Sequence, residues 1–93
     1  MRSNQYGVVP TWLEKYLLFL QREACYYCGV NIARGYQLDH VIPLSKGGLH
    51  DWSNIVLSCR TCNARKSFLS LETFLDRQRE AGIPVNLRFY FLK

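Results

Sequence analysis

The sequence predicts a small α+β fold, in which a two-stranded antiparallel hairpin and a short helix lie between two flanking helices. Two Cys-x-x-Cys pairs bracket the middle of the chain, and two segments of strand-like composition lie between these pairs. Apolar residues recur at helical spacing on both sides of this central part. With 93 residues, the chain is long enough for a single domain of residues 1–93, whose core we place at about residues 25–68.

The first helix is expected at about residues 11–23, after a loose arm of residues 1–9. Thr11 and Glu14 have the spacing of a capping box, which is typical of a helix start. For this aromatic-rich stripe we prefer core packing over a platform for base stacking. The side chains at helical spacing that we expect to be buried are Trp12, Leu13, Tyr16, Leu17 and Leu20.

The hairpin is expected to follow the first cysteine pair. Gly29 lets the chain turn there, so that backbone amides face the sulfurs. We predict strands at Gln37 to Ile42 and at Asn54 to Ser58. Pro43 ends the first strand and opens a connection of about ten residues, which is too long for a simple turn.

Two helices are expected after the hairpin. The second cysteine pair leads into a short helix of about residues 61–68, and Ser70 caps another helix of about residues 70–81. Gly82 follows this last helix, as is common at a helix end. The tail of residues 85–92 has strand-like composition. The inward-facing residues of the last helix are predicted to be Leu71, Phe74 and Leu75.

The four cysteines predict a structural zinc site. They are Cys25, Cys28, Cys59 and Cys62, and each pair can present two thiolates to one tetrahedral ion. A structural metal would also stabilise so short a chain. Two disulfides are the alternative, but the N-terminus does not resemble a secretory signal. We therefore expect a cytoplasmic or otherwise intracellular protein.

Neither a membrane nor a particular partner follows from composition alone. The apolar run from Tyr16 to Leu20 is far too short to span a membrane. Twelve Lys and Arg residues outnumber seven acidic residues, which gives a net charge of +5. This charge makes a polyanionic partner plausible. Composition alone does not decide whether that partner is a nucleic acid.

Three segments together resemble a known enzyme family. They are residues 38–48 (LDHVIPLSKGG), 54–57 (NIVL) and 59–66 (CRTCNARK). In this order, and with the first cysteine pair, they resemble the HNH endonucleases of the ββα-metal, or His-Me finger, class. The resemblance covers about residues 25–66 and implies a ββα-metal core, with the four-cysteine zinc site, that hydrolyses phosphodiester bonds in DNA.

The chemistry of three residues agrees with this implication. His40 titrates near neutral pH and is the natural general base for activating water. Asp39 and Asn63 offer hard oxygen ligands of the kind that Mg²⁺ or Mn²⁺ prefers. The family name implies histidine at the third motif position, where this chain has Asn63. For Asn54, the middle motif residue, the resemblance implies backbone bonds across the loop that hold His40 in orientation.

Regular strand geometry poses a problem for this site. Successive residues of a strand point to opposite faces, so Asp39 and His40 would not both serve one phosphate on an ideal strand. The strand must therefore bend, bulge or end at these residues. Pro43 is consistent with such a break.

Basic residues near the motif are expected to contact the DNA backbone as a group. They are Lys46, Arg60, Arg65 and Lys66. His50 matches no motif position, so we expect it to be solvated or to make a minor backbone contact. The chain is too short for an added helix-turn-helix, so specificity is expected to be low or supplied by a protein partner.

Two hypotheses follow. The first is a metal-dependent endonuclease of a phage, mobile element, restriction or packaging system, with double-stranded DNA as the expected substrate. The second is a non-catalytic zinc-ribbon module that binds nucleic acid or protein. The second hypothesis would make Asp39, His40 and Asn63 coincidental.

Overall fold

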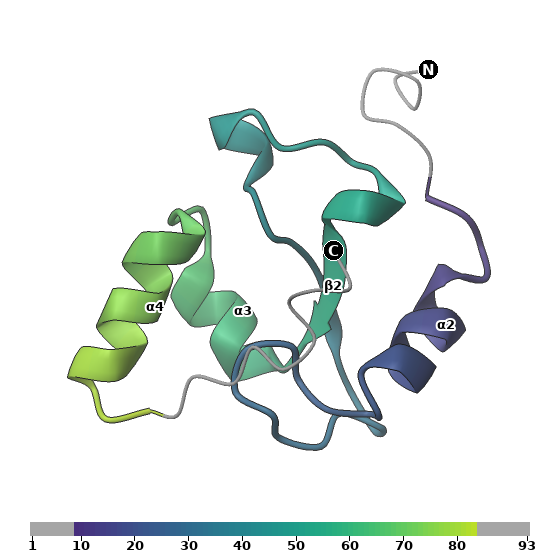
Figure 1. The fold of residues 1–93 in the computed structure, drawn as a ribbon, viewed down its shortest axis with the longest axis horizontal. Helices are drawn as coiled ribbons and strands as arrows, with labels where there is room; N and C mark the ends of the chain where they lie inside the picture. Colours follow the sequence, from purple (N-terminus) through teal and green to yellow (C-terminus); the bar gives the residue numbers. More distant parts are fainter. Residues whose placement is uncertain (1–8, 84–93) are drawn as a thin grey trace.

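The computed structural model describes residues 9–83 as an α+β fold, which confirms the predicted fold class. In Figure 1, helix α2 lies on one side of the hairpin, and helices α3 and α4 lie on the other. None of the helices in residues 9–83 combines the length and the apolar character needed to cross a membrane. The elements in chain order are α2 (Leu13–Leu20), β1 (Gln37–His40), η1 (Leu44–Lys46), η2 (Trp52–Asn54), β2 (Ile55–Ser58), α3 (Arg60–Lys66) and α4 (Leu71–Glu80).

The hairpin consists of two antiparallel strands of four residues each. Gln37 pairs with Ser58 at one end, and His40 pairs with Ile55 at the other. All four residues of β2 are buried, because α2 packs against this strand on one side of the hairpin. β1 ends at His40, two residues before the predicted end, and α3 packs against it.

Helix α2 is shorter and less buried than predicted. It begins at Leu13 after Trp12, whose side chain forms no capping hydrogen bond, so the predicted capping box is wrong. Only Leu13 and Leu17 are buried, because so short a helix resting on one strand buries a stripe one residue wide. Trp12 and Tyr16 are 56% and 45% exposed, and they contact each other edge to face at 5.5 Å between ring centroids.

Gln21 attaches the end of α2 to β2. Its side-chain amide accepts a hydrogen bond from the backbone N–H of Leu57 at 3.0 Å and donates to the Leu57 carbonyl at 2.9 Å. The same amide nitrogen donates to the carbonyl of Ala24 at 2.9 Å. Gln21 is 2% exposed and occupies the position of a neighbouring strand. Local sequence patterns did not predict this contact.

The second half of the fold follows the prediction more closely. The Ser70 hydroxyl caps α4 by accepting a hydrogen bond from the Thr73 N–H at 3.2 Å, as predicted. Phe74 and Leu75 are buried, and Leu71 packs against them as a partly buried residue. α3 starts one residue earlier than predicted and ends at Lys66 rather than at Phe68, because the next residue, Ser67, has a positive φ of 46°. The predicted tail strand and nearly all of the N-terminal arm lie outside the described residues.

We expect the substitution Gln21→Ala to lower the free energy of unfolding by about 1–3 kcal/mol, because it leaves the buried N–H of Leu57 in β2 without its partner. Chemical denaturation of the zinc-loaded protein measures this change. Lys15→Ala, an exposed position on the same helix, is the control and should change the stability by less than about 0.5 kcal/mol. Equal stability of the two variants would contradict the role of Gln21.

Candidate active site and metal centres

The four cysteines form one cluster. Their sulfur atoms all lie within 4.8 Å of one another, and all four cysteines are free. Four thiolates bound to tetrahedral Zn²⁺ at about 2.3 Å stand about 3.8 Å apart. The sulfurs of Cys28 and Cys59 are 3.8 Å apart. The cluster therefore fits a closed structural zinc site and does not form the alternative disulfides.

Backbone amides surround these sulfurs. The N–H groups of Tyr27 and Cys59 donate to the Cys25 sulfur at 3.4 and 3.3 Å. The Cys59 sulfur accepts a hydrogen bond from the N–H of Cys62 at 3.3 Å and in this way caps the start of α3. Gly29 turns the chain after the first pair with a φ of 84°. The cluster thus ties the turn before β1 to the start of α3.

Asp39 is buried, and both oxygens of its carboxylate have partners. The Tyr27 hydroxyl donates a short hydrogen bond to Oδ2, and the Lys66 ammonium lies 3.4 Å from the same oxygen. The Asn63 amide nitrogen donates to Oδ1 at 3.2 Å. Burial raises the pKa of the Asp39 carboxyl, while the Tyr27 hydrogen bond and the Lys66 charge act in the opposite direction.

Lys66 lies inside the protein, although we predicted that it would contact DNA from the surface. Its side chain is fully buried, and its ammonium donates to the backbone carbonyl of His40 at 2.7 Å. A buried ammonium needs such partners, because an unpaired charge is very costly away from water. The other predicted DNA contacts are exposed: Arg60 and Arg65 on α3, and Lys46 in η1.

His40 contacts a second histidine. Its Nε2 lies 2.9 Å from Nδ1 of His50, which comes from the loop between the strands. Burial and the neighbouring His50 lower the pKa of His40, which favours the neutral imidazole. We expected His50 to be solvated or to make a minor backbone contact. No motif position marks it, and the only sequence signal is that the second histidine of the chain lies in this loop.

Asn54 continues the hairpin beyond the end of β1. Its side chain accepts from the Ile42 N–H at 2.9 Å and donates to the Ile42 carbonyl at 3.0 Å. It also donates to the Leu49 carbonyl at 2.9 Å. A side chain at Gly48 would collide with the Ile42 carbonyl and the Asn54 amide, so this close approach requires glycine. Asn54 therefore holds the two ends of the loop together next to His40.

Asp39, His40 and Asn63 line one cavity of about 320 Å³. The rest of its wall comes from Leu38 of β1, from the loop after β1 and from the residues that follow α3. Regular alternation would have placed Asp39 and His40 on opposite faces. Both nevertheless line this cavity, which lies at the end of β1.

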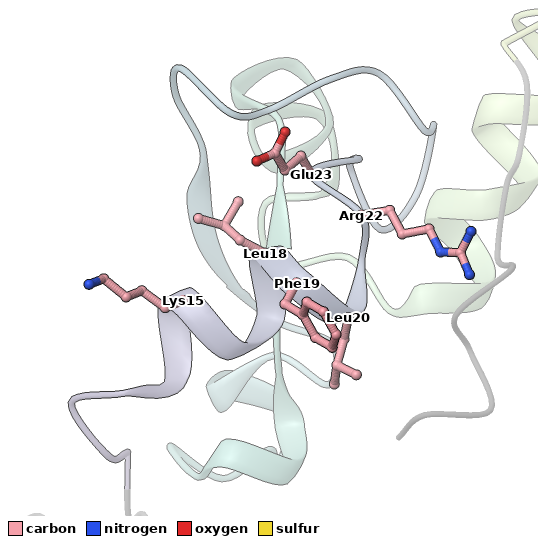
Figure 2. A pocket seen from close by; sticks show the side chains of 6 residues that line it. All are labelled: Lys15, Leu18, Phe19, Leu20, Arg22 and Glu23. Atoms are coloured by element: carbon pink, nitrogen blue, oxygen red, sulfur yellow. The ribbon is translucent and has the colours of Figure 1, made fainter.

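A larger cavity lies elsewhere and contains none of the predicted site residues. Figure 2 shows this cavity, of about 740 Å³, beside the second half of α2. Phe19 in its wall is 78% exposed. The residues that line it are Lys15, Leu18, Phe19, Leu20, Arg22 and Glu23. Its size therefore does not indicate the site of chemistry.

Comparisons with known proteins place this geometry in a family. The model of the HNH endonuclease family matches residues 25–68. The CRISPR-associated endonuclease Cas9 of Actinomyces naeslundii is 38% identical over 71 residues, which cover 72% of this chain but 6% of Cas9. The "Probable HNH endonuclease" of Lactococcus phage SK1 is 30% identical over 64 residues, which cover 60% of this chain and 68% of the phage protein.

The fold shows the same relationship. The crystal structure of the Type II-C Cas9 enzyme from Actinomyces naeslundii matches with a TM-score of 0.64 and 34% sequence identity. The match covers 77% of this chain and 8% of the Cas9 chain, so this chain spans a small part of that relative. The family model, the phage relative and the shared fold agree, and this chain belongs to the HNH endonuclease family.

Proposed function

We propose that this chain is a metal-dependent endonuclease that hydrolyses phosphodiester bonds in double-stranded DNA. The observation that carries this proposal is the single cavity lined by Asp39, His40 and Asn63. It brings a base and two oxygen ligands together on a core that belongs to a family of endonucleases. A binding module without catalysis would not require this combination.

His40 is the proposed general base. A neutral imidazole has one donor and one acceptor nitrogen. When Nε2–H of His40 donates to Nδ1 of His50, Nδ1 of His40 is left to accept a proton from the attacking water. His50 then selects the tautomer and stabilises the imidazolium that forms. Asn54 and the Lys66 ammonium hold the backbone on which His40 is carried.

Asp39 and Asn63 are the proposed ligands of a catalytic divalent ion. Both carry hard oxygen atoms of the kind preferred by Mg²⁺ and Mn²⁺, and their side chains already touch. A half-turn of the Asn63 amide exchanges its nitrogen for its oxygen next to Oδ1 of Asp39. When bound, such an ion stabilises negative charge on the reacting phosphate and the leaving oxygen.

The cysteine cluster is proposed to hold structural Zn²⁺. A closed four-thiolate site has no open position for substrate, so its function is to fix the turn of residues 25–28 against α3. Free zinc-binding thiolates persist in a reducing compartment, which agrees with an intracellular, cytoplasmic setting.

The exposed basic residues are the proposed contacts with the DNA backbone. Arg60 and Arg65 lie on α3, which also carries Asn63, and Lys46 lies in the loop after β1. Phosphate contacts of this kind position DNA without reading its sequence. We therefore propose low specificity or a protein partner that supplies it. The phage relative favours a phage or mobile-element setting.

His40→Ala is expected to reduce plasmid cleavage by at least about 100-fold in Mg²⁺ or Mn²⁺, because it removes the general base. The zinc content and the denaturation midpoint should stay close to those of the wild type. Cleavage at the wild-type rate would show that His40 is not the base. A wild-type protein that cuts under neither metal would instead favour a non-catalytic zinc module.

His50→Ala is expected to slow single-turnover cleavage by roughly 10-fold, because the orienting acceptor for His40 is lost. His50→Asn should recover much of this rate, since its amide oxygen can accept at a position similar to Nδ1. Mapped cleavage of a plasmid under single-turnover conditions measures both rates. Equal rates for the alanine and asparagine variants would exclude the orienting role.

Cys28→Ser is expected to lower the zinc content and unfold the central part of the chain, because structural zinc contributes directly to folding. Metal analysis and far-UV circular dichroism measure the two effects. Excess Mg²⁺ should not restore cleavage, since it does not replace zinc at thiolates. Ser45→Ala, in the exposed loop after β1, is the control and should retain zinc. A folded, active Cys28→Ser protein without zinc would contradict the structural role.

A further inference from the structure

We infer that Tyr27 is a positioning residue for Asp39, and that it connects the cysteine cluster to the catalytic ion. This inference rests on the proposed function, in which Asp39 binds that ion. The Tyr27 hydroxyl donates to Oδ2 of the Asp39 carboxylate, and Oδ1 faces Asn63. Asp39 would then bind the ion through one oxygen only.

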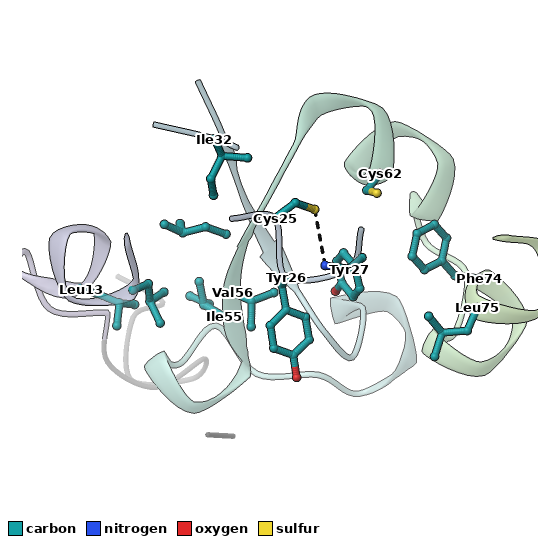
Figure 3. Close-up of a cluster of buried hydrophobic side chains, with 12 residues drawn as sticks. Leu13, Cys25, Tyr26, Tyr27, Ile32, Ile55, Val56, Cys62, Phe74 and Leu75 are labelled. Atoms are coloured by element: carbon teal, nitrogen blue, oxygen red, sulfur yellow. Dashed lines mark hydrogen bonds between the residues drawn. The ribbon is translucent and has the colours of Figure 1, made fainter. Parts of the chain in front are cut away.

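The backbone of Tyr27 is held by the cysteine cluster. Tyr27 lies between two of the proposed zinc ligands, Cys25 and Cys28. Its N–H donates to the Cys25 sulfur at 3.4 Å, and Figure 3 shows this bond as a dashed line. The position of its ring therefore depends on the same cluster that anchors α3.

The ring of Tyr27 is fixed by packing. It is 1% exposed and lies edge to face against Tyr26 and against Phe74 of α4, each at 5.2 Å between centroids. Figure 3 shows the rings of Tyr27 and Phe74 close together within the core. A ring held in this way keeps its hydroxyl in one position. The Asp39 carboxylate is therefore already oriented, and it loses little further side-chain entropy when the ion binds.

The hydroxyl acts together with Lys66. Both approach Oδ2 of Asp39, the ammonium at 3.4 Å and the hydroxyl through a short hydrogen bond. Carboxylates that ligate metals are commonly held by such outer partners, and removing one of these partners weakens metal affinity by about 10–100-fold. Lys66 neutralises the carboxylate charge from α3. Tyr27 instead links Asp39 to the cysteine cluster, because its backbone bonds to the Cys25 sulfur and its hydroxyl bonds to Asp39.

The substitution Tyr27→Phe tests this role, because it keeps the ring and its packing and removes one oxygen atom. Calorimetric titration of Mn²⁺ into the zinc-loaded protein without DNA measures the affinity of the ion directly. We expect Tyr27→Phe to weaken Mn²⁺ binding by about 10-fold or more. In cleavage assays the metal concentration for half-maximal rate should rise by a similar factor, while the rate at saturating metal changes less.

Tyr26→Phe is the matched control. Tyr26 is the neighbouring residue and is equally buried at 1%, but among residues 9–83 its hydroxyl forms no hydrogen bond with Asp39. This variant should bind Mn²⁺ as tightly as the wild type. Zinc content and the denaturation midpoint, measured for both variants, show whether the cluster and the fold are retained.

The outcomes separate this inference from the proposed function. Weaker Mn²⁺ binding by Tyr27→Phe alone supports the inference. Unchanged binding by Tyr27→Phe, or equal weakening in both variants, overturns it while the proposed ion site stands. A wild-type protein that binds no Mn²⁺ overturns the ion site and the inference together. The same holds if Asp39→Ala leaves the Mn²⁺ affinity unchanged.

Discussion

The arrangement of the site depends on the contacts of the buried Asp39 carboxylate. Two separate parts of the chain contact it: the turn between the first cysteines through Tyr27, and α3 through Asn63 and Lys66. A charge buried in this way is tolerated only when it is paired and hydrogen-bonded. The same partners that make its burial possible also hold Oδ1 toward Asn63, which lines the same cavity, so stability and proposed chemistry share one set of contacts.

The cysteine cluster brings these parts into register. The first pair precedes β1, and the second pair begins α3, so one tetrahedral ion would fix both approaches to Asp39. A chain of this length buries a modest core, and metal binding adds stability that hydrophobic burial alone supplies less easily. In the proposed arrangement the structural metal would not react, but it would set the distance between the strand that carries His40 and the helix that carries Asn63.

Two side-chain amides extend the hydrogen bonding of the short hairpin. β1 and β2 have four residues each, which is little for an independent sheet. Gln21 pairs with both backbone groups of Leu57, and Asn54 pairs with both backbone groups of Ile42. Each amide takes the place of a strand residue, one beside β2 and one beyond the end of β1. The hairpin can therefore end at His40 without leaving the polar groups of Ile42 unpaired.

The sequence by itself determined the parts that depend on neighbouring residues: the paired cysteines, the two strands of the hairpin and the helix capped by Ser70. It also indicated Asp39, His40 and Asn63 as a set, because the order of the motif is local and specific. Only the tertiary structure decided the partners across the fold. Lys66 is buried, His50 contacts His40, and Trp12 is exposed, since each outcome depends on which distant surface covers the residue. Spacing along the chain reports which face of an element a residue occupies, whereas burial and pairing depend on what packs against that face.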